Sequence, residues 1–431
     1  MPFLPITHFT MYTPPPISFR NPLFTVLFLC IGLTGCAKIS AWQTSGAYQL
    51  TDHAIALALN DFKGGGTSND FGVEAVPKLP MPKSLRPCCA FGNRLKAKLG
   101  EMPLAGFRLD NIRAPADLGP HKYDNGIVSL DLSDNRGWVD IENNGLVYTC
   151  RGGFIDTAHV RDNADLTMFL AAQAGRHIDK GGISAVPDQG GKIRIIFHPV
   201  TKEVLNEHGR LQLAAYIGQW TAFQLSIWHE IATWYGFASL IAWPEKLSSF
   251  SPEDLYSNLL GVKIAGAIIT SLQAPDEHTY NRYMDQWIKR VLTRLQAVSK
   301  DDGIKAINSV DGIWWDSQRR LPDWKITQRR HFLTAKKIEP WLISMAAAPL
   351  DACVNTEPRL DLFYRSAIAG IRFNELVTIE IKVDDALIKH GFPLLSGDQQ
   401  TITQSDFTRL SKEIRAEVIK LLGRRADQPT L

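Results

Sequence analysis

The sequence predicts a helix-rich α+β protein with a single main domain and a small antiparallel β-hairpin or sheet. Two patterns favour this fold class. From residue 156 onward, most long segments repeat apolar residues at helical spacing. The strand-like segments are few and short, and one pair of them flanks an Asn-Gly turn signal at 144–145. The composition, with 45% hydrophobic and 21% charged residues, is that of an ordinary globular protein.

The expected elements follow from the periodicity of apolar residues. Helices are expected over residues 52–62, 156–177, 210–237, from Ser251 onward, 277–298 and 404–422, and strands over 125–132, 138–141, 146–150, 192–199 and 377–383. The strands 138–141 and 146–150 form the predicted hairpin, because Asn and Gly both tolerate the positive φ that its turn requires.

Two helices have features that predict their surroundings. Helix 210–237 is apolar on all sides, which is typical of a helix at the centre of a core. The next helix begins with Ser251 as the predicted N-cap, Pro252 at the first helical position and Asp254 two residues later. Small residues from Gly261 onward allow a neighbouring helix to approach it closely.

The N-terminal residues are typical of an exported lipoprotein. The apolar run 23–32 is shorter than the ~20 residues needed to span a bilayer, and Leu33-Thr34-Gly35-Cys36 follows it. Small residues beside a cysteine suit a lipoprotein cleavage site. We therefore expect residues 1–35 to be a signal peptide and Cys36 to carry the lipid.

Two details refine this expectation. Arg20 is the only charge ahead of the apolar run, which leaves Met1 and Met11 as alternative starts of translation. Ala37, and not an aspartate, follows Cys36. The expected location is therefore the outer membrane, with the lipid-anchored protein facing the periplasm.

Composition divides the chain into four parts. The signal peptide (1–35) is followed by a flexible tether rich in glycine and proline (36–85), a main helix-rich α+β domain (86–350) and a strand–helix extension packed on it (351–431).

Four cysteines besides Cys36 remain in the mature chain, and an exported compartment permits disulfides between them. Adjacent cysteines seldom bond to each other, because the geometry is strained. Cys88 or Cys89 could pair with Cys150 or with Cys353, and the sequence leaves that choice open. No cysteine spacing resembles a zinc ribbon.

Charge and motifs exclude several classes of function. The formal net charge is only +3, and no basic stripe is present, so nucleic-acid binding is not expected. The sequence has no Gly-x-Ser-x-Gly elbow, phosphate loop or Gly-x-Gly-x-x-Gly motif. The expected partners are the membrane, through lipid on Cys36, and an unknown envelope substrate or protein.

Asp156, His159 and Asp162 recur every three residues at the start of a predicted helix. They could share one helical face, where a histidine with carboxylates can bind a metal or act as an oriented base. The alternative is an ordinary helix N-terminus with an aspartate cap. Arg151 is the only sign of an electropositive niche for Cys150, which we expect to end a strand or join a disulfide rather than act as a nucleophile.

His229 and Glu230 lie inside the very apolar helix 210–237, where an unpaired charge is costly. The zinc-protease pattern His-Glu-x-x-His is excluded, because Thr233 occupies the position of the second histidine. The alternative is a core histidine with a satisfied hydrogen bond. Farther along, Asn258 is a polar residue in a packing helix and is predicted to point into a site.

Several segments together resemble the bacterial lipoproteins grouped as Domain of Unknown Function 4056. They are residues 86–92 (Arg-Pro-Cys-Cys-Ala-Phe-Gly), 118–121, 143–156, 229–236 and 250–261. The resemblance covers roughly residues 86–350. It implies export and one main domain, but it names no reaction and no catalytic residue.

These observations lead to two hypotheses. In the first, the protein is a periplasm-facing hydrolase, and its metal ligands would be Asp156, His159, His229 and Glu230, holding a divalent ion such as zinc. His159, Asp162 and Glu230 would be catalytic, with Arg151 and Asn258 elsewhere in the pocket. Without a metal, His159 or His229 could still act as a general base.

In the second hypothesis, the protein is a non-catalytic envelope lipoprotein with a binding or assembly role, and the same residues form a buried structural network. Geometry separates the two. His159 and His229 within reach of each other in an open pocket would favour the hydrolase, and separated or sealed histidines would favour the network.

Overall fold

The computed structural model describes residues 50–60, 76, 78–83, 85–87, 89–125, 142–239, 244–271, 274, 276–334, 336–354, 356–368, 370–394 and 400–430. All of them belong to one compact unit, Ser45–Leu431. The predictions for the signal peptide, Cys36, Cys88 and strand 138–141 lie outside the described residues, as does strand 125–132 beyond its first residue.

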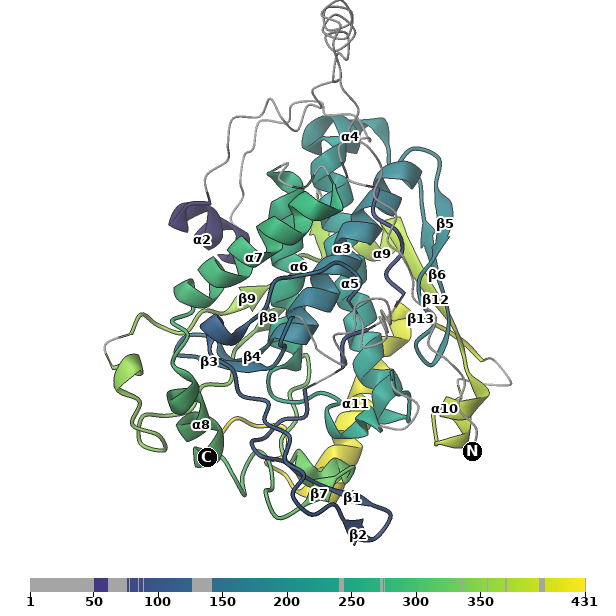
Figure 1. Cartoon of the computed structure of the whole chain (residues 1–431). Helices are drawn as coiled ribbons and strands as arrows, with labels where there is room; N and C mark the ends of the chain where they lie inside the picture. Colours follow the sequence, from purple (N-terminus) through teal and green to yellow (C-terminus); the bar gives the residue numbers. More distant parts are fainter. Residues whose placement is uncertain are drawn as a thin grey trace, which may run out of the picture. The chain divides into compact units, whose positions relative to one another are not determined.

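Three long helices lie side by side at the centre of this unit (Figure 1). They are α3 (Thr157–His177), α5 (Arg210–Trp234) and α6 (Asp254–Thr270). The predicted helices 156–177 and 210–237 are thus confirmed, with α5 ending three residues early. As its all-round apolar sequence predicts, α5 packs against both α3 and α6.

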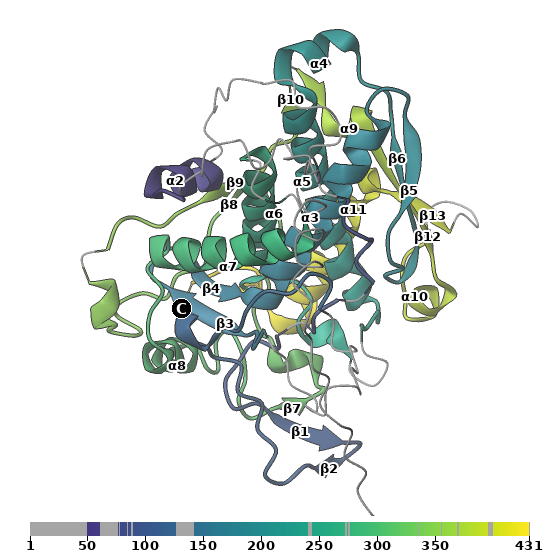
Figure 2. The same ribbon diagram turned by 45° about the horizontal axis from the view of Figure 1, so that its top comes forward.

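A four-stranded antiparallel sheet covers one side of the helices (Figure 2). Its order is β13 (Thr401–Thr403), β12 (Val377–Val383), β6 (Gly191–Phe197) and β5 (Gly182–Ala185). Alternate residues of β6 and β12 are buried, which is the pattern of strands with one face on a core. Helix α11 (Gln404–Leu422) follows β13 and packs on α5. The predicted α+β class is confirmed.

The remaining elements surround these. They are α2 (Asp52–Asn60), β1 (Lys96–Leu99), β2 (Met102–Pro103), β3 (Leu146–Thr149), β4 (Gly153–Asp156), α4 (Lys202–His208), α7 (Glu277–Arg294), α8 (Lys300–Ser309), β7 (Arg320–Leu321), β8 (Lys337–Ile338), β9 (Leu362–Phe363), β10 (Ala367–Ile368), β11 (Ile371–Arg372), α9 (Phe373–Leu376) and α10 (Asp385–Lys389), with 3-10 turns at Pro115–Asp117, Glu245–Leu247, Trp324–Ile326 and Asp351–Cys353. Within the range expected to form the tether, α2 packs on α6 and α7, and its Ile55 and Leu59 are buried. Among the described residues, no helix combines the length and the apolar character needed to cross a membrane.

The structure gives β3 and Cys150 partners that the sequence did not name. Strand β3 pairs with β4, the strand that follows it, with Leu146 opposite Asp156. Cys150, which follows β3, forms a disulfide with Cys353. The expectation that Cys150 ends a strand or joins a disulfide is confirmed, and the structure decides its partner, which the sequence left open. A separation of 203 residues cannot be read from local spacing. The disulfide also removes Cys150 as a nucleophile.

The start of α6 differs from the predicted cap. The helix begins at Asp254, and Ser251 provides no side-chain cap. Instead, the Asp254 carboxylate accepts the backbone N–H of Ser251 at 2.6 Å, and the Ser251 hydroxyl donates to Glu253 at 3.0 Å. Residues 251–253 therefore form a turn ahead of the helix.

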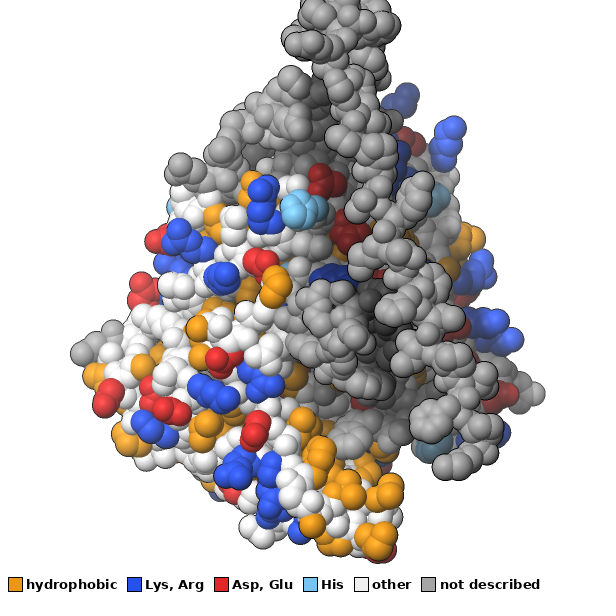
Figure 3. Space-filling model, in the orientation of Figure 1, with side chains coloured by type: hydrophobic (Ala, Val, Ile, Leu, Met, Phe, Trp, Pro, Cys, Tyr) orange, Lys and Arg blue, Asp and Glu red, His pale blue; other side chains and the backbone are white. Residues whose placement is uncertain are grey.

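The hairpin β1–β2 extends from the core of this unit, beside β7. Hydrophobic side chains gather over its end in the space-filling view, at the place that β1 and β2 occupy in the ribbon (Figure 3).

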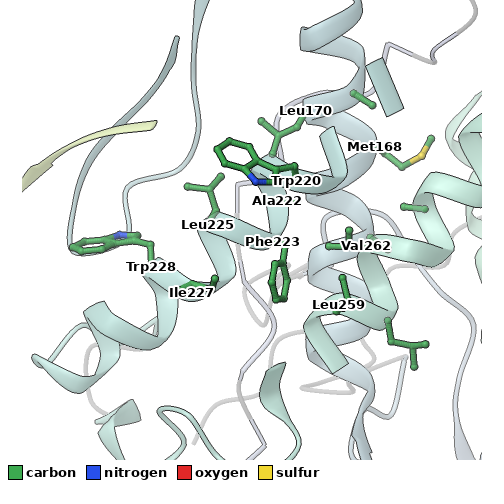
Figure 4. Packing of buried hydrophobic residues seen from close by; sticks show 14 of the residues in the cluster. Met168, Leu170, Trp220, Ala222, Phe223, Leu225, Ile227, Trp228, Leu259 and Val262 are labelled. Carbon is green, nitrogen blue, oxygen red and sulfur yellow. The ribbon is translucent and has the colours of Figure 1, made fainter. Parts of the chain in front are cut away.

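The core between the three central helices is tightly packed (Figure 4). Trp220, Phe223 and Leu225 of α5 lie in the same cluster as side chains of α3 and α6. A Cβ added to Gly261 of α6 would collide with the backbone carbonyl of Val160 on α3. The close approach predicted from the small residues of this helix is thus confirmed.

Replacing Gly261 by alanine is expected to destabilise the protein by about 1–3 kcal/mol, because the two helices must move apart. Chemical denaturation measures the difference. Gly303→Ala in α8 is the matched control, since a Cβ there meets side-chain carbon of Ile112 at 3.0 Å and no backbone within 4 Å. We expect the control to lose less than about 0.5 kcal/mol. Equal losses would contradict the assigned contact.

Candidate functional site

Three buried side chains from the three central helices meet at one point. His159 lies in the first turn of α3, Asp254 is the first residue of α6, and Glu230 lies near the end of α5. Each offers a ligand atom, and these atoms all lie within 4.8 Å of one another. Two helix N-termini therefore face the group, and their dipoles favour negative charge there.

The contacts within the group are specific. Nδ1 of His159 lies 3.2 Å from Oδ1 of Asp254. Oε2 of Glu230 accepts the backbone N–H of Phe250 at 2.7 Å, and Phe250 has a positive φ of 54°. A bulky residue in the left-handed region costs free energy, and such strain is frequent at functional sites.

Two carboxylate oxygens in the group are unsatisfied hydrogen-bond acceptors among the described residues. Oε1 of Glu230 and Oδ1 of Asp254 are both buried, and within the described part of the chain neither accepts a hydrogen bond of good geometry. The imidazole Nδ1 of His159 lies 3.2 Å from Oδ1 of Asp254. The two carboxyl groups are close enough to share a proton. Because a buried polar atom normally has a partner, these oxygens suit either a shared proton or a cation.

The surrounding charges leave an excess of acid. Burial, together with the charge of Asp254, raises the pKa of Glu230 well above its usual value, and burial also raises those of Glu253 and Asp156. The buried guanidinium nearby is Arg330, whose pKa burial lowers to about 10. Arg330 donates to the backbone carbonyls of Ser249 and Trp324. Protons or a bound cation must therefore balance the carboxyl groups.

Asp156, a predicted metal ligand, acts instead as the N-cap of α3. One carboxylate oxygen accepts the N–H of Ala158 at 2.8 Å, and the other accepts the N–H of Cys89 at 3.1 Å. Both oxygens are thus used by the backbone. The geometry matches the alternative interpretation, an aspartate cap, for this residue.

His229, the other predicted ligand outside the group, faces a different direction from Glu230. Successive residues of a helix point about 100° apart. Nδ1 of His229 lies 3.1 Å from Oε1 of Gln189, and its ring meets that of His159 edge to face, with 6.3 Å between centroids. Burial, followed by the charge of His159, lowers the pKa of His229 to about 3, so this imidazole is neutral at pH 7.

His159 and His229 both line a pocket between α3, α5 and the first turns of α6, with a cavity volume of about 50 Å³. The two histidines thus share a pocket, with 6.3 Å between their ring centroids, but His229 is not part of the group that could hold a metal. The other lining residues are Pro82, Leu85, Arg86, Asp162, Asn163, Asp165, Leu166, Pro187, Gln189, Leu225, Ser226 and Asn258.

Asn258 lies in the pocket wall, as its sequence context predicts. Its Oδ1 accepts from Nδ2 of Asn163 at 2.8 Å, and the same nitrogen donates to the carbonyl of His159 at 3.0 Å. The pair lies one helical turn beyond His159 and Asp254, so two polar contacts join α3 to α6. This arrangement fixes the position of the imidazole.

Asp162 also lines the pocket. Arg86 holds it through Nη1 at 2.7 Å and through its backbone N–H at 3.0 Å. Burial raises the pKa of Asp162 to about 7, against the opposing charge of Arg86. Asp162 can therefore exchange a proton near neutral pH.

Arg86 belongs to a buried polar network that the sequence did not predict. Its guanidinium contacts Glu142 at 2.5 and 2.8 Å and Asp165 at 3.0 Å, and His121 contacts Asp165 at 3.0 Å. Arg86 and His121 both fall in motifs that carry the family resemblance, which was the available signal. Asp254 was also missed, because a capping pattern explained it.

Arg151, predicted to lie in the pocket, is elsewhere. It donates to the carbonyls of Pro358 and Arg294 and forms an ion pair with Glu357 at 2.7 Å. Its role is to fasten the end of β3 to the C-terminal part of the chain.

Comparison with known proteins gives one match. A family described as protein of unknown function (DUF4056) matches residues 76–344, a range that contains His159, Glu230 and Asp254. No curated protein and no solved structure matches the chain.

Proposed function

This chain belongs to the DUF4056 family, and on that premise we propose that it is a lipid-anchored hydrolase of the cell envelope, with its catalytic site in the pocket lined by His159. The observation that supports the proposal is the group formed by His159, Glu230 and Asp254 beside that pocket. One imidazole and two carboxylates converge there with two oxygens that accept no hydrogen bond of good geometry from the described residues.

The donor set fits a divalent cation. Three protein ligands of nitrogen and oxygen type, with further positions left open, are characteristic of catalytic zinc sites. A cation would also balance the excess of buried carboxyl groups. Bound there, it would polarise a carbonyl or phosphoryl oxygen and activate water near neutral pH.

The residues of the chain have distinct roles in this proposal. Without a cation, Oδ1 of Asp254 would orient the imidazole of His159 through Nδ1, 3.2 Å away; with a cation bound, both residues would be ligands. Asp162 moves a proton at the pocket wall. Neutral His229 and the amide of Asn258 offer hydrogen bonds to an uncharged polar group of an envelope substrate.

The second candidate is a non-catalytic binding or assembly role. Each of the three residues in the group is at most 5% exposed, which is also what a structural network would show.

Metal content separates the two. The test uses the chain from residue 36 onward with Cys36→Ser, purified without chelator. We expect about one equivalent of a divalent metal in this protein, and its loss in His159→Ala and in Asp254→Asn. His229→Ala is the control and should keep the metal. The same proteins are assayed on peptidoglycan, lipid esters and peptides, where hydrolysis should disappear with His159→Ala.

A protein that holds no metal, even after incubation with zinc or manganese, would refute the metal site and leave His159 and Asp254 as an acid–base pair. Hydrolysis that persists in His159→Ala would refute the catalytic role of the pocket.

A further inference from the structure

The β1–β2 hairpin is fixed to the protein at its base. Backbone hydrogen bonds of 3.0 and 2.9 Å join Leu95 to Leu109, and Lys96 of β1 pairs in parallel with Arg320 of β7. Leu95 and Ala97 are buried among hydrophobic residues of the core. The hairpin therefore has a defined direction relative to the compact unit.

The other end of the hairpin is apolar and uncovered. Leu99 and Met102, which face each other across the strands, are both 70% exposed. Leu104 and Phe107 are also exposed, at 40% and 38%. Figure 3 shows hydrophobic side chains gathered over this end.

Strand alternation explains how this surface arises. Leu95, Ala97 and Leu99 lie on one face of β1, because side chains at i, i+2 and i+4 point the same way. The first two are covered by the core, and Leu99 extends beyond it. The row of apolar side chains on this face of β1 therefore continues past the edge of the core, to Leu99.

The segment that carries the apolar end is basic. Within residues 94–109 the bases are Arg94, Lys96, Lys98 and Arg108, and the one acid is Glu101. Glu101 forms an ion pair with Lys98 at 3.3 Å. The segment therefore has a net charge of +3, which complements an anionic surface.

A lipid surface fits this combination better than a protein does. A stable protein interface buries about 800 Å² on each partner, far more than four side chains at a projecting tip can supply. An apolar end on a basic segment suits a bilayer, which offers both an acyl region and charged headgroups. We propose that the β1–β2 hairpin inserts its apolar end into the headgroup region of an anionic phospholipid bilayer. This inference goes beyond the proposed function and does not depend on activity at the pocket.

Co-sedimentation with vesicles tests it. The chain from residue 37 onward is suitable, since no buried hydrophobic residue of the described core precedes Ala54. We expect it to bind vesicles of phosphatidylcholine with about one-third phosphatidylglycerol, and more weakly at high salt. Leu99→Ser with Met102→Ser should lower the affinity at least about tenfold. The matched control is Ile183→Ser with Val354→Ser, which removes two side chains of 53% and 52% exposure from other elements and should leave binding unchanged.

Absence of binding by the parent chain, or equal loss in both double variants, would overturn the proposal. So would a concentration-dependent dimer that Leu99→Ser with Met102→Ser abolishes, because the hairpin would then bind a second copy. His159→Ala should bind vesicles like the parent chain, and this result separates failure of the hairpin proposal from failure of the hydrolase proposal.

Discussion

Glu230→Gln is expected to stabilise the metal-free protein at pH 8 by about 1–2 kcal/mol while abolishing metal binding. Glu230 is buried, and one of its oxygens has no N–H or O–H donor among the described residues. In the variant, the amide oxygen can still accept the N–H of Phe250, and the amide N–H₂ can donate toward Asp254. The amide of the variant thus takes the place of a Glu230 carboxyl group that has bound a proton.

The pH dependence fixes the sign. Burial raises the pKa of Glu230 in the folded state. The stability that its proton contributes is therefore complete below the unfolded pKa, about 4.3, and is lost as the pH rises through the folded pKa. The variant has no such proton to lose, so the two proteins should differ little at pH 4 and most at pH 8.

Denaturation in the presence of chelator, across this pH range, measures the difference. The control is Glu380→Gln, which changes an exposed ion pair with Arg194. The control should change stability by less than about 1 kcal/mol. A large loss of stability in Glu230→Gln at pH 8 would instead favour a structural network over a functional site.

Arg86→Met is expected to destabilise the protein by about 3–5 kcal/mol at pH 7. The guanidinium of Arg86 is buried and contacts Glu142, Asp162 and Asp165. Methionine is apolar and of similar length, so it leaves these carboxylates buried without their cation. Arg359→Met is the matched control, because Arg359 forms ion pairs with Glu339 and Asp361 at the surface and should cost less than about 1 kcal/mol.

The effect of Arg86 should shrink in acid. Burial alone would raise the pKa of Glu142, but Arg86 holds it below the usual range, and His121 and Arg86 do the same for Asp165. The stability that such groups contribute is present above their unfolded pKa, about 4, and is lost as the pH falls through the folded values. A gap between parent and variant that stays constant from pH 7 to pH 3 would contradict this assignment.

The site combines local and distant contributions. Asp156 caps α3 through the N–H of Ala158 and so sets where the helix begins. His159, in the first turn of that helix, thereby faces Asp254 of α6. His159 contacts Asp254 and also lines the polar pocket, so it connects the buried carboxyl groups with the pocket. In this position, the buried imidazole of His159 can respond both to the charge of the carboxyl groups and to a ligand in the pocket.

The sequence by itself determined the features that depend on short-range periodicity. It placed α3, α5, α11, β6 and β12 to within a few residues, because helical and strand patterns are set by neighbours three, four or two residues away. It also singled out His159, from its three-residue spacing with Asp156 and Asp162, and Glu230 and Asn258, since polar residues in apolar helices need a reason to be buried.

Only the tertiary structure decided which of the polar residues meet. His229 and Glu230 are adjacent in the chain, yet the packing of α5 turns one toward the pocket and the other toward Asp254. Asp254 looked like a cap until α6 was brought against α3, and Arg151 looked like a pocket residue until Glu357 and Pro358 were placed beside it. The bond between Cys150 and Cys353 spans 203 residues. Such partners are chosen by the approach of whole elements, which is set by the summed packing of the core and leaves no local mark in the sequence.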